Sequence, residues 1–331
     1  MEPNSSNTPT ARCPVDPTAS QVVDSMERMA GAAYPDRRRS SARGACFTGT
    51  FTPTGAAAEL TTAAHLQQEP VPVTVRFSNS EGNPHVPDAA PVTRGMATRF
   101  HLPDGSATDL LAITVPLFVA ATPAEFLGLT EALAPDPTSG HPDPARVQEY
   151  VAKHPHLAGP ITQQPPVPAS YGSAAYWAIH AFLWVDADGA RQPVRYRWQP
   201  AAGRTNLTAE EAATKADDYL TAELHERLER EPVVFTLYVQ LGEAGDPTYD
   251  PTVAWPAERR ELAVGRLELT APVEDQEHWS AQSFDPSRLT DGIELSDDPV
   301  LAFRSLAYAE SFRRRSQFTA DQSASEKSDQ R

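Results

Sequence analysis

Two residues near the C-terminal end of the sequence, Arg304 and Tyr308, have the types and the spacing to hold a metal through a phenolate. Asp297 or Asp298 can cap the N-terminus of a helix whose first turn holds Pro299. In that helix Arg304 and Tyr308 lie one turn apart on the same face. A nearby guanidinium favours the ionised form of a phenol. Tyrosinate is one of the axial ligands of haem iron, so the pair is compatible with a haem site. Taken alone, an ordinary pair on the surface of a helix is the competing interpretation.

The elements that must position this pair begin with a series of short strands. Runs rich in β-branched, aromatic and alternating residues are separated by turns that contain Gly, Pro, Asn and Asp. We expect strands over residues 45–52, 71–78, 95–102, 107–115, 176–185, 193–198, 233–241 and 262–269. The hairpin-like turns between them favour an antiparallel sheet or barrel.

Helical segments are inserted between these strands and follow them. Helices are expected over residues 19–32, from Thr122, over residues 208–230 and from Pro299. Residues 135–168 contain many prolines and are expected to wrap around the surface. Three parts follow from these patterns: a flexible segment (1–18), one folded domain (19–316) and a flexible tail (317–331).

Composition limits the class of protein. The chain has 331 residues, a hydrophobic content of 40% and a mean hydropathy of −0.44. No apolar run reaches the length of a membrane span, and no secretory signal is recognisable, so a cytoplasmic location is expected. The net charge of −16 disfavours nucleic acids and anionic membranes as partners. Cys13 and Cys46 are too few for a disulfide framework or a zinc site.

Two basic triplets, residues 37–39 and 313–315, stand out in this acidic chain. Such a triplet is usually a solvated face of the protein. Both triplets flank segments that we assign to one pocket, and an anionic ligand between them is the competing interpretation.

Several segments occur in an order that is informative as a set. They are residues 42–51, Val75-Arg76-Phe77-Ser78, residues 94–100, residues 109–118, and residues 284–299 leading to Arg304 and Tyr308. As a set they resemble the haem catalase family, and more closely its small members, the catalase-related peroxidases. The resemblance covers roughly residues 19–316.

This resemblance implies an α+β fold, in which a closed eight-stranded antiparallel β-barrel carries inserted and C-terminal helices. Haem b would lie between the barrel and the C-terminal helix, with Tyr308 as the axial ligand of the iron and Arg304 as its partner. The remaining residues that the resemblance places at the cofactor are Arg38, Arg76 and Arg315, which would bind the haem propionates, and Ser78.

The sequence departs from the family on the distal side, where peroxide would bind. Ser41 stands where the family has its distal histidine, and Thr114 stands where it has an asparagine. Both are expected to line the distal side. Loss of a general base typically costs about 10²–10⁴-fold in rate, so weak catalase activity is expected. No other histidine, including His85 in a turn and His180 in a strand, is assigned the missing role.

The main hypothesis is therefore a haem-dependent, peroxidase-like oxidoreductase that uses hydrogen peroxide or an organic hydroperoxide. An alternative is a catalase-like enzyme of specialised metabolism that oxidises, dehydrates or rearranges a small organic substrate. A second alternative is a non-catalytic haem-binding or sensing protein, and a haem-free solute-binding barrel is a remoter one. The expected oligomeric state is monomer or homodimer.

Overall fold

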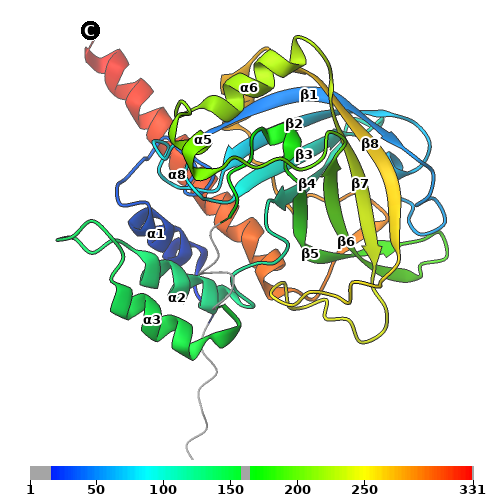
Figure 1. Ribbon diagram of the computed structural model, residues 1–331, viewed down its shortest axis with the longest axis horizontal. Helices are drawn as coiled ribbons and strands as arrows, with labels where there is room; N and C mark the ends of the chain where they lie inside the picture. The colour runs from blue at the N-terminus through cyan, green and yellow to red at the C-terminus, as the bar shows by residue number, and fades with distance from the viewer. Residues whose placement is uncertain (1–15, 158–164, 330–331) are drawn as a thin grey trace, which may run out of the picture.

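An antiparallel β-barrel forms the centre of the computed structural model, which describes residues 16–157 and 165–329 (Figure 1). Its strands follow the order β4-β3-β2-β1-β8-β7-β6-β5, and pairing of Ile113 with Trp177 joins β4 to β5 and closes the ring. The strands are β1 (Gly44–Pro53), β2 (Val71–Asn79), β3 (Arg94–His101), β4 (Ala107–Ile113), β5 (Tyr176–Val185), β6 (Arg191–Pro200), β7 (Val233–Leu241) and β8 (Glu261–Pro272). A short strand, β9 (Ile293–Leu295), adds to β5. The predicted closed eight-stranded barrel is confirmed.

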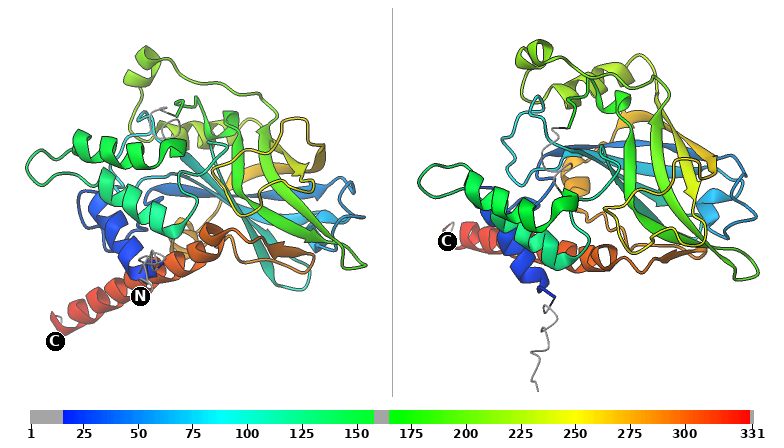
Figure 2. Two further views of the ribbon diagram at one scale, coloured as in Figure 1. Left: turned by 90° about the horizontal axis from the view of Figure 1, so that it is seen from below. Right: turned by 60° about the horizontal axis from the view of Figure 1, so that its bottom comes forward.

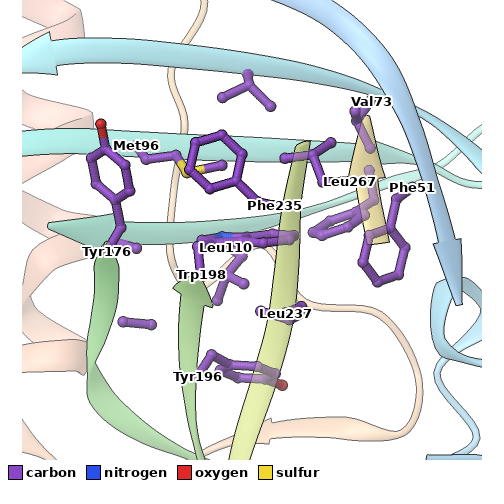
Figure 3. Close-up of a cluster of buried hydrophobic side chains, with 14 of the residues drawn as sticks. Phe51, Val73, Met96, Leu110, Tyr176, Tyr196, Trp198, Phe235, Leu237 and Leu267 are labelled. Carbon is purple, nitrogen blue, oxygen red and sulfur yellow. The ribbon is translucent and has the colours of Figure 1, made fainter. Parts of the chain in front are cut away.

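The inside of the barrel is filled with side chains. Alternate residues of each strand point inward, and Phe51, Trp198 and Phe235 are fully buried there (Figure 3). The described side chains leave a void of about 20 Å³ beside His65, which is room for about one water molecule. A larger ligand must therefore bind outside the barrel wall.

Helices gather against one side of the barrel and create that outside site. They are α1 (Ala19–Met29), α2 (Pro123–Leu133), α3 (Pro144–Lys153) and the long α8 (Pro299–Asp329), which runs past the barrel and projects beyond it (Figures 1 and 2). The predicted start signals are confirmed. Asp298 accepts hydrogen bonds from the backbone N–H groups of Val300 and Leu301, and Thr122 caps α2.

The prediction of one continuous helix over residues 208–230 is wrong. Two helices, α5 (Ala209–Ala213) and α6 (Tyr219–Leu228), replace it. Between them the carbonyl of Asp217 accepts hydrogen bonds from the backbone of Asp88 and the side chain of Arg43. These contacts take that carbonyl away from the hydrogen-bond pattern of a helix.

The two chain ends also differ from the expectation or lie outside it. Residues 317–329, expected as a flexible tail, continue α8 as helix. The physical reason is that no Gly or Pro follows Pro299 in the sequence. The expected flexible segment 1–18 lies mostly outside the described residues.

The remaining helices are α7 (Gln276–Ala281) and the short 3₁₀ turns η1 (Ala64–Leu66), η2 (Pro155–Leu157) and η3 (Tyr171–Ser173). Within residues 16–157 and 165–329, no helix has the length and apolar character to cross a membrane.

Candidate active site

A cavity of about 340 Å³ lies between the outer face of β2–β4 and the helices α1, α2 and α8. Seven of the eight predicted site residues line it: Arg38, Ser41, Arg76, Ser78, Arg304, Tyr308 and Arg315. They come from the loop after α1, from β2 and from α8. The fold thus brings together side chains that are up to 277 positions apart in the sequence, the separation of Arg38 and Arg315.

Thr114 is the predicted residue that the structure does not bring to the cavity wall. Its hydroxyl accepts a hydrogen bond from the backbone N–H of Arg94 at 3.0 Å. Its neighbours Ile113 and Val115 line the cavity instead. Thr114 lies in a bend just after β4, and its hydroxyl is turned toward the backbone of Arg94.

The α8 side of the cavity holds the phenol that the sequence singled out. Arg304 Nη2 donates a hydrogen bond to Tyr308 Oη at 2.6 Å, and its guanidinium lies 5.4 Å from the centre of the Tyr308 ring. A positive donor at this distance stabilises negative charge on the phenol oxygen. The hydroxyl of Ser305 donates to Asp285, which ties α8 to the segment before β9.

Behind this pair lies a buried contact that the sequence did not reveal. His180 Nδ1 donates to Asp298 Oδ2 at 2.6 Å, and both side chains are almost fully buried. Burial lowers the pKa of His180 to about 4, and the positive charge of Arg304 lowers it further while Asp298 opposes the shift. We therefore describe the contact as a neutral imidazole donating to a carboxylate rather than as an ion pair. Among the described residues His180 Nε2 has no hydrogen-bond partner.

Three arginines, Arg38, Arg76 and Arg315, meet at the cavity, and no carboxylate of the described residues pairs with them. Burial lowers the pKa of Arg38 to about 8, with repulsion from Arg76 and Arg315 as smaller causes. Burial followed by repulsion from Arg76 lowers the pKa of Arg315 to about 10. The Nε atoms of Arg76 and Arg315 are buried, and the described residues offer them no partner. Unsatisfied buried guanidinium groups of this kind are suited to bind carboxylates.

The neighbouring residues explain why these arginines in particular remain without a carboxylate partner. Arg39 also lines the cavity, but its guanidinium is neutralised by Glu27, to which Nε donates at 2.5 Å. Arg37 is exposed and pairs with Asp36. In the second triplet, Arg313 and Arg314 both pair with Glu310, and Arg315 remains for the cavity.

A glycine makes room for Arg76. A Cβ atom on Gly44 would lie 2.3 Å from the Phe77 carbonyl oxygen and 2.8 Å from Arg76 Cζ. No side chain fits in that space, so Gly44 allows the guanidinium to pack against β1. There Arg76 Nη2 donates to the carbonyl of Ser41 at 3.0 Å.

The side of the cavity around Ser41 carries hydroxyl groups and apolar side chains. Ser41 is the one non-glycine residue with a left-handed backbone, at φ +58°, among the residues described. Ser41 Oγ and Ser78 Oγ both lie within 4 Å of the position that a Cβ on Gly95 would take. No histidine of the described chain lines the cavity. Most other lining residues are apolar, among them Val23, Met26, Leu111, Ile113, Phe118 and Phe126.

Comparison with known proteins agrees with this arrangement. The catalase family profile matches residues 1–323. A catalase-related peroxidase of Mycolicibacterium paratuberculosis is 42% identical over 302 residues, which are 90% of this chain and 95% of that relative. A catalase-related peroxidase of Synechococcus elongatus is 34% identical over 303 residues, which are 90% of this chain and 88% of the relative.

The chain belongs to the catalase family.

Larger catalases match over part of their length only: Catalase-2 of Bacillus subtilis is 29% identical over 276 residues, which are 40% of that protein. Membership of the catalase family confirms the predicted haem-dependent, peroxidase-like oxidoreductase and leaves the reaction open. Catalase-family proteins carry haem, and the donor set described above fits such a group. One phenol oxygen is available for iron, and three uncompensated arginines are available for the two propionates.

Proposed function

We propose that this protein binds haem b in the cavity, with Tyr308 as the axial ligand and with Arg38, Arg76 and Arg315 on the propionates. We further propose that it reduces organic hydroperoxides rather than disproportionating hydrogen peroxide. The observation that carries the cofactor proposal is the 2.6 Å Arg304–Tyr308 contact, which faces the same cavity as three unneutralised arginines. The names of the two similar catalase-related peroxidases support the peroxidase reaction.

Each residue on the α8 side has a defined task in this proposal. When bound, the haem iron supplies the two-electron chemistry that cleaves a peroxide bond. Arg304 donates a hydrogen bond to the Tyr308 oxygen and would stabilise the negative charge of that oxygen as a ligand of the iron. The neutral His180 lies behind Arg304 and adds no positive charge of its own there.

The Ser41 side determines which peroxide is used. Peroxide cleavage needs a base that takes the first proton and returns it to the leaving oxygen. The cavity wall presents the hydroxyls of Ser41 and Ser78 but, among the described residues, no imidazole or carboxylate. A serine hydroxyl can orient a hydroperoxide but cannot act as a base near neutral pH. The apolar lining favours a substrate with a hydrocarbon group, because burying it contributes about 25 cal/mol per Å².

A second candidate function also has an observation in its favour. The Ser41 side of the cavity joins hydroxyl groups with apolar side chains, a combination suited to holding a small organic molecule beside the cofactor. An organic substrate with its own acidic or basic group would replace the missing base. The reaction would then be an oxidation, dehydration or rearrangement of that substrate.

The test is the absorption spectrum of the purified protein supplied with haem, recorded before and after addition of cumene hydroperoxide or hydrogen peroxide. We expect a high-spin ferric spectrum of the tyrosinate type that Tyr308→Phe abolishes. Tyr249→Phe is the matched control, because Tyr249 is 58% exposed and does not line the cavity. Absence of haem binding by the wild type would refute the proposal. Spectral shifts with non-peroxide organic compounds, without peroxide turnover, would favour the second candidate.

A further inference from the structure

Trp279 is a half-buried tryptophan on α7, at the surface beside the candidate active site. The sequence contains 5 tryptophans. Trp184, Trp198 and Trp255 are buried, and Trp177 is the other half-buried one. A peroxidase needs an electron donor as well as a peroxide, and indole is among the few side chains that can pass on single electrons. Trp279 and Trp177 are therefore the two candidate tryptophans at which electrons can enter the protein from a donor in solution.

The segment that carries Trp279 runs directly into the cavity wall. Gln282 follows three positions later, and its carbonyl accepts a hydrogen bond from Arg38 Nη2 at 2.5 Å. Ser283 and Phe284 then line the cavity. Ser283 is four positions after Trp279, and four residues of chain span at most about 14 Å, so the backbone of Trp279 lies within electron-transfer reach of the cavity wall.

This segment is fixed to the barrel on its other side. The Gln276 side chain at the start of α7 accepts from the backbone N–H of Cys46 at 2.9 Å and donates to its carbonyl at 2.7 Å. Asp275 caps α7 by accepting from the backbone of His278. The short helix therefore holds the indole at a defined place relative to β1 and the cavity.

The surroundings of Trp279 suit a neutral or cationic aromatic donor. The rings of His101 and His278 lie edge-on to the indole, at 5.7 Å and 5.6 Å between centres. Exposed carboxylates flank it at Glu274, Asp275 and Glu277. Negative charge of this density repels anionic donors and attracts cationic ones.

We propose that Trp279 is a surface site at which phenols or aromatic amines donate electrons to the cofactor in the cavity. The proposal rests on the proposed peroxidase function. The Trp279 indole gives one electron inward and is restored by one electron from a phenol, whose hydroxyl proton leaves to water. Two phenols and one hydroperoxide react in each cycle: 2 ArOH + ROOH gives 2 ArO• + ROH + H₂O. The peroxide oxygen–oxygen bond breaks, the peroxide is reduced, and the two phenols are oxidised.

The first experiment locates the oxidised residue directly. Haem-loaded wild-type protein is treated with cumene hydroperoxide and a nitroso spin trap without any donor, and the adduct is mapped by peptide mass spectrometry. We expect the adduct on Trp279 and its loss when a phenol is present in excess. An adduct on Trp177, on Tyr249 or on a cavity residue instead would overturn the proposal while leaving the peroxidase function intact. Absence of haem binding or of peroxide consumption would overturn both.

The second experiment uses a donor that cannot enter the cavity. Turnover is measured with a phenol coupled to a polyethylene glycol chain, in wild type, Trp279→Phe and the matched control Trp177→Phe. We expect Trp279→Phe to lose about tenfold or more in turnover of the coupled phenol, a change of about 1.4 kcal/mol in the barrier, while Trp177→Phe keeps it. Haem content and thermal unfolding establish that each variant is folded. Unchanged turnover in a folded, haem-loaded Trp279→Phe variant would contradict the proposal.

Discussion

The cavity wall formed by α8 differs from the opposite wall around Ser41 in how its polar groups are held. On the α8 wall, Tyr308 is fixed by Arg304 from the same helix, and Asp298, which caps that helix, is bonded to His180. On the Ser41 wall, hydroxyl groups sit among apolar side chains from β4, α1 and α2. On the α8 wall, polar side chains are held by hydrogen bonds to one another. On the Ser41 wall, most side chains are held by apolar packing and share few such bonds. The side chain of Ser41 can therefore be exchanged while its backbone carbonyl keeps the hydrogen bond from Arg76.

The largest expected effect tests the dependence within the α8 wall. Arg304→Leu removes the donor to the Tyr308 oxygen and leaves a phenol in an apolar setting, which disfavours the phenolate. We expect loss of the tyrosinate spectrum and a fall in peroxidase turnover of about 10²–10³-fold, similar to the loss of one preorganised charge-stabilising donor. The control is Arg313→Leu, on the same helix but exposed and paired with Glu310. Equal losses in the two variants would remove the special role of Arg304.

The next prediction tests the independence of the Ser41 wall. Ser41→His supplies an imidazole at the position where the family resemblance places one. Histidine is tolerated in the left-handed backbone region better than most residues, so φ +58° is no obstacle. We expect oxygen release from hydrogen peroxide to rise about 10–10²-fold, the lower part of the range for general acid–base catalysis. Ser106→His is the control, because Ser106 is exposed and does not line the cavity. If oxygen release did not rise in a folded, haem-loaded Ser41→His protein, the missing base would not be the sole cause of low catalase activity.

The effect of Arg38 on the free energy of unfolding should have opposite signs with and without the anionic ligand. Without a ligand, Arg38→Leu removes a buried, unneutralised charge, and we expect a gain in unfolding free energy of about 1–3 kcal/mol. With haem bound, the same change should be destabilising. The pKa of Arg38 is about 8 in the folded chain and higher when unfolded, so between these values the unfolded state binds more protons. The wild type should therefore recover stability relative to Arg38→Leu as the pH rises through 8.

Urea unfolding of both proteins at several pH values, with and without haem, measures this effect. The matched control is Arg37→Leu, since Arg37 is exposed and paired with Asp36. If Arg38→Leu destabilised the ligand-free protein at pH 7, the arginine cluster would not be the unneutralised site described here.

The smallest effect concerns the helices that close the Ser41 wall. Ser25 of α1 and Thr130 of α2 are buried, and their hydroxyls share a hydrogen bond at 2.7 Å. Ser25→Ala and Thr130→Ala, singly and together, form a double-mutant cycle with an expected coupling of about 0.5–1.5 kcal/mol. Thermal unfolding gives the coupling, and turnover should change little because neither hydroxyl lines the cavity. A coupling near zero would mean that α1 and α2 are held by apolar packing alone.

Local signals in the sequence predicted most of the fold and the α8 wall. The Asp298–Pro299 start, the spacing of Arg304 and Tyr308, and the alternating strands all act over short stretches of chain. The features that were missed depend on long-range contacts. His180 and Asp298 are 118 positions apart, and the break between α5 and α6 depends on Arg43 and Asp88. Thr114 is assigned from the resemblance alone, and the direction of its side chain depends on the hydrogen bond with the backbone of Arg94, which is 20 positions away.

The position of α8 has a consequence for the order in which the molecule is assembled. The eight strands of the barrel are complete at Pro272, whereas Tyr308 and Arg315 belong to the last described element of the chain. During synthesis from the N-terminus, the barrel can form before these two residues have been made. Haem can then be enclosed only when α8 docks against the finished barrel. The cofactor would thus be captured late, and a shortage of haem should leave a folded barrel whose last helix is loosely attached.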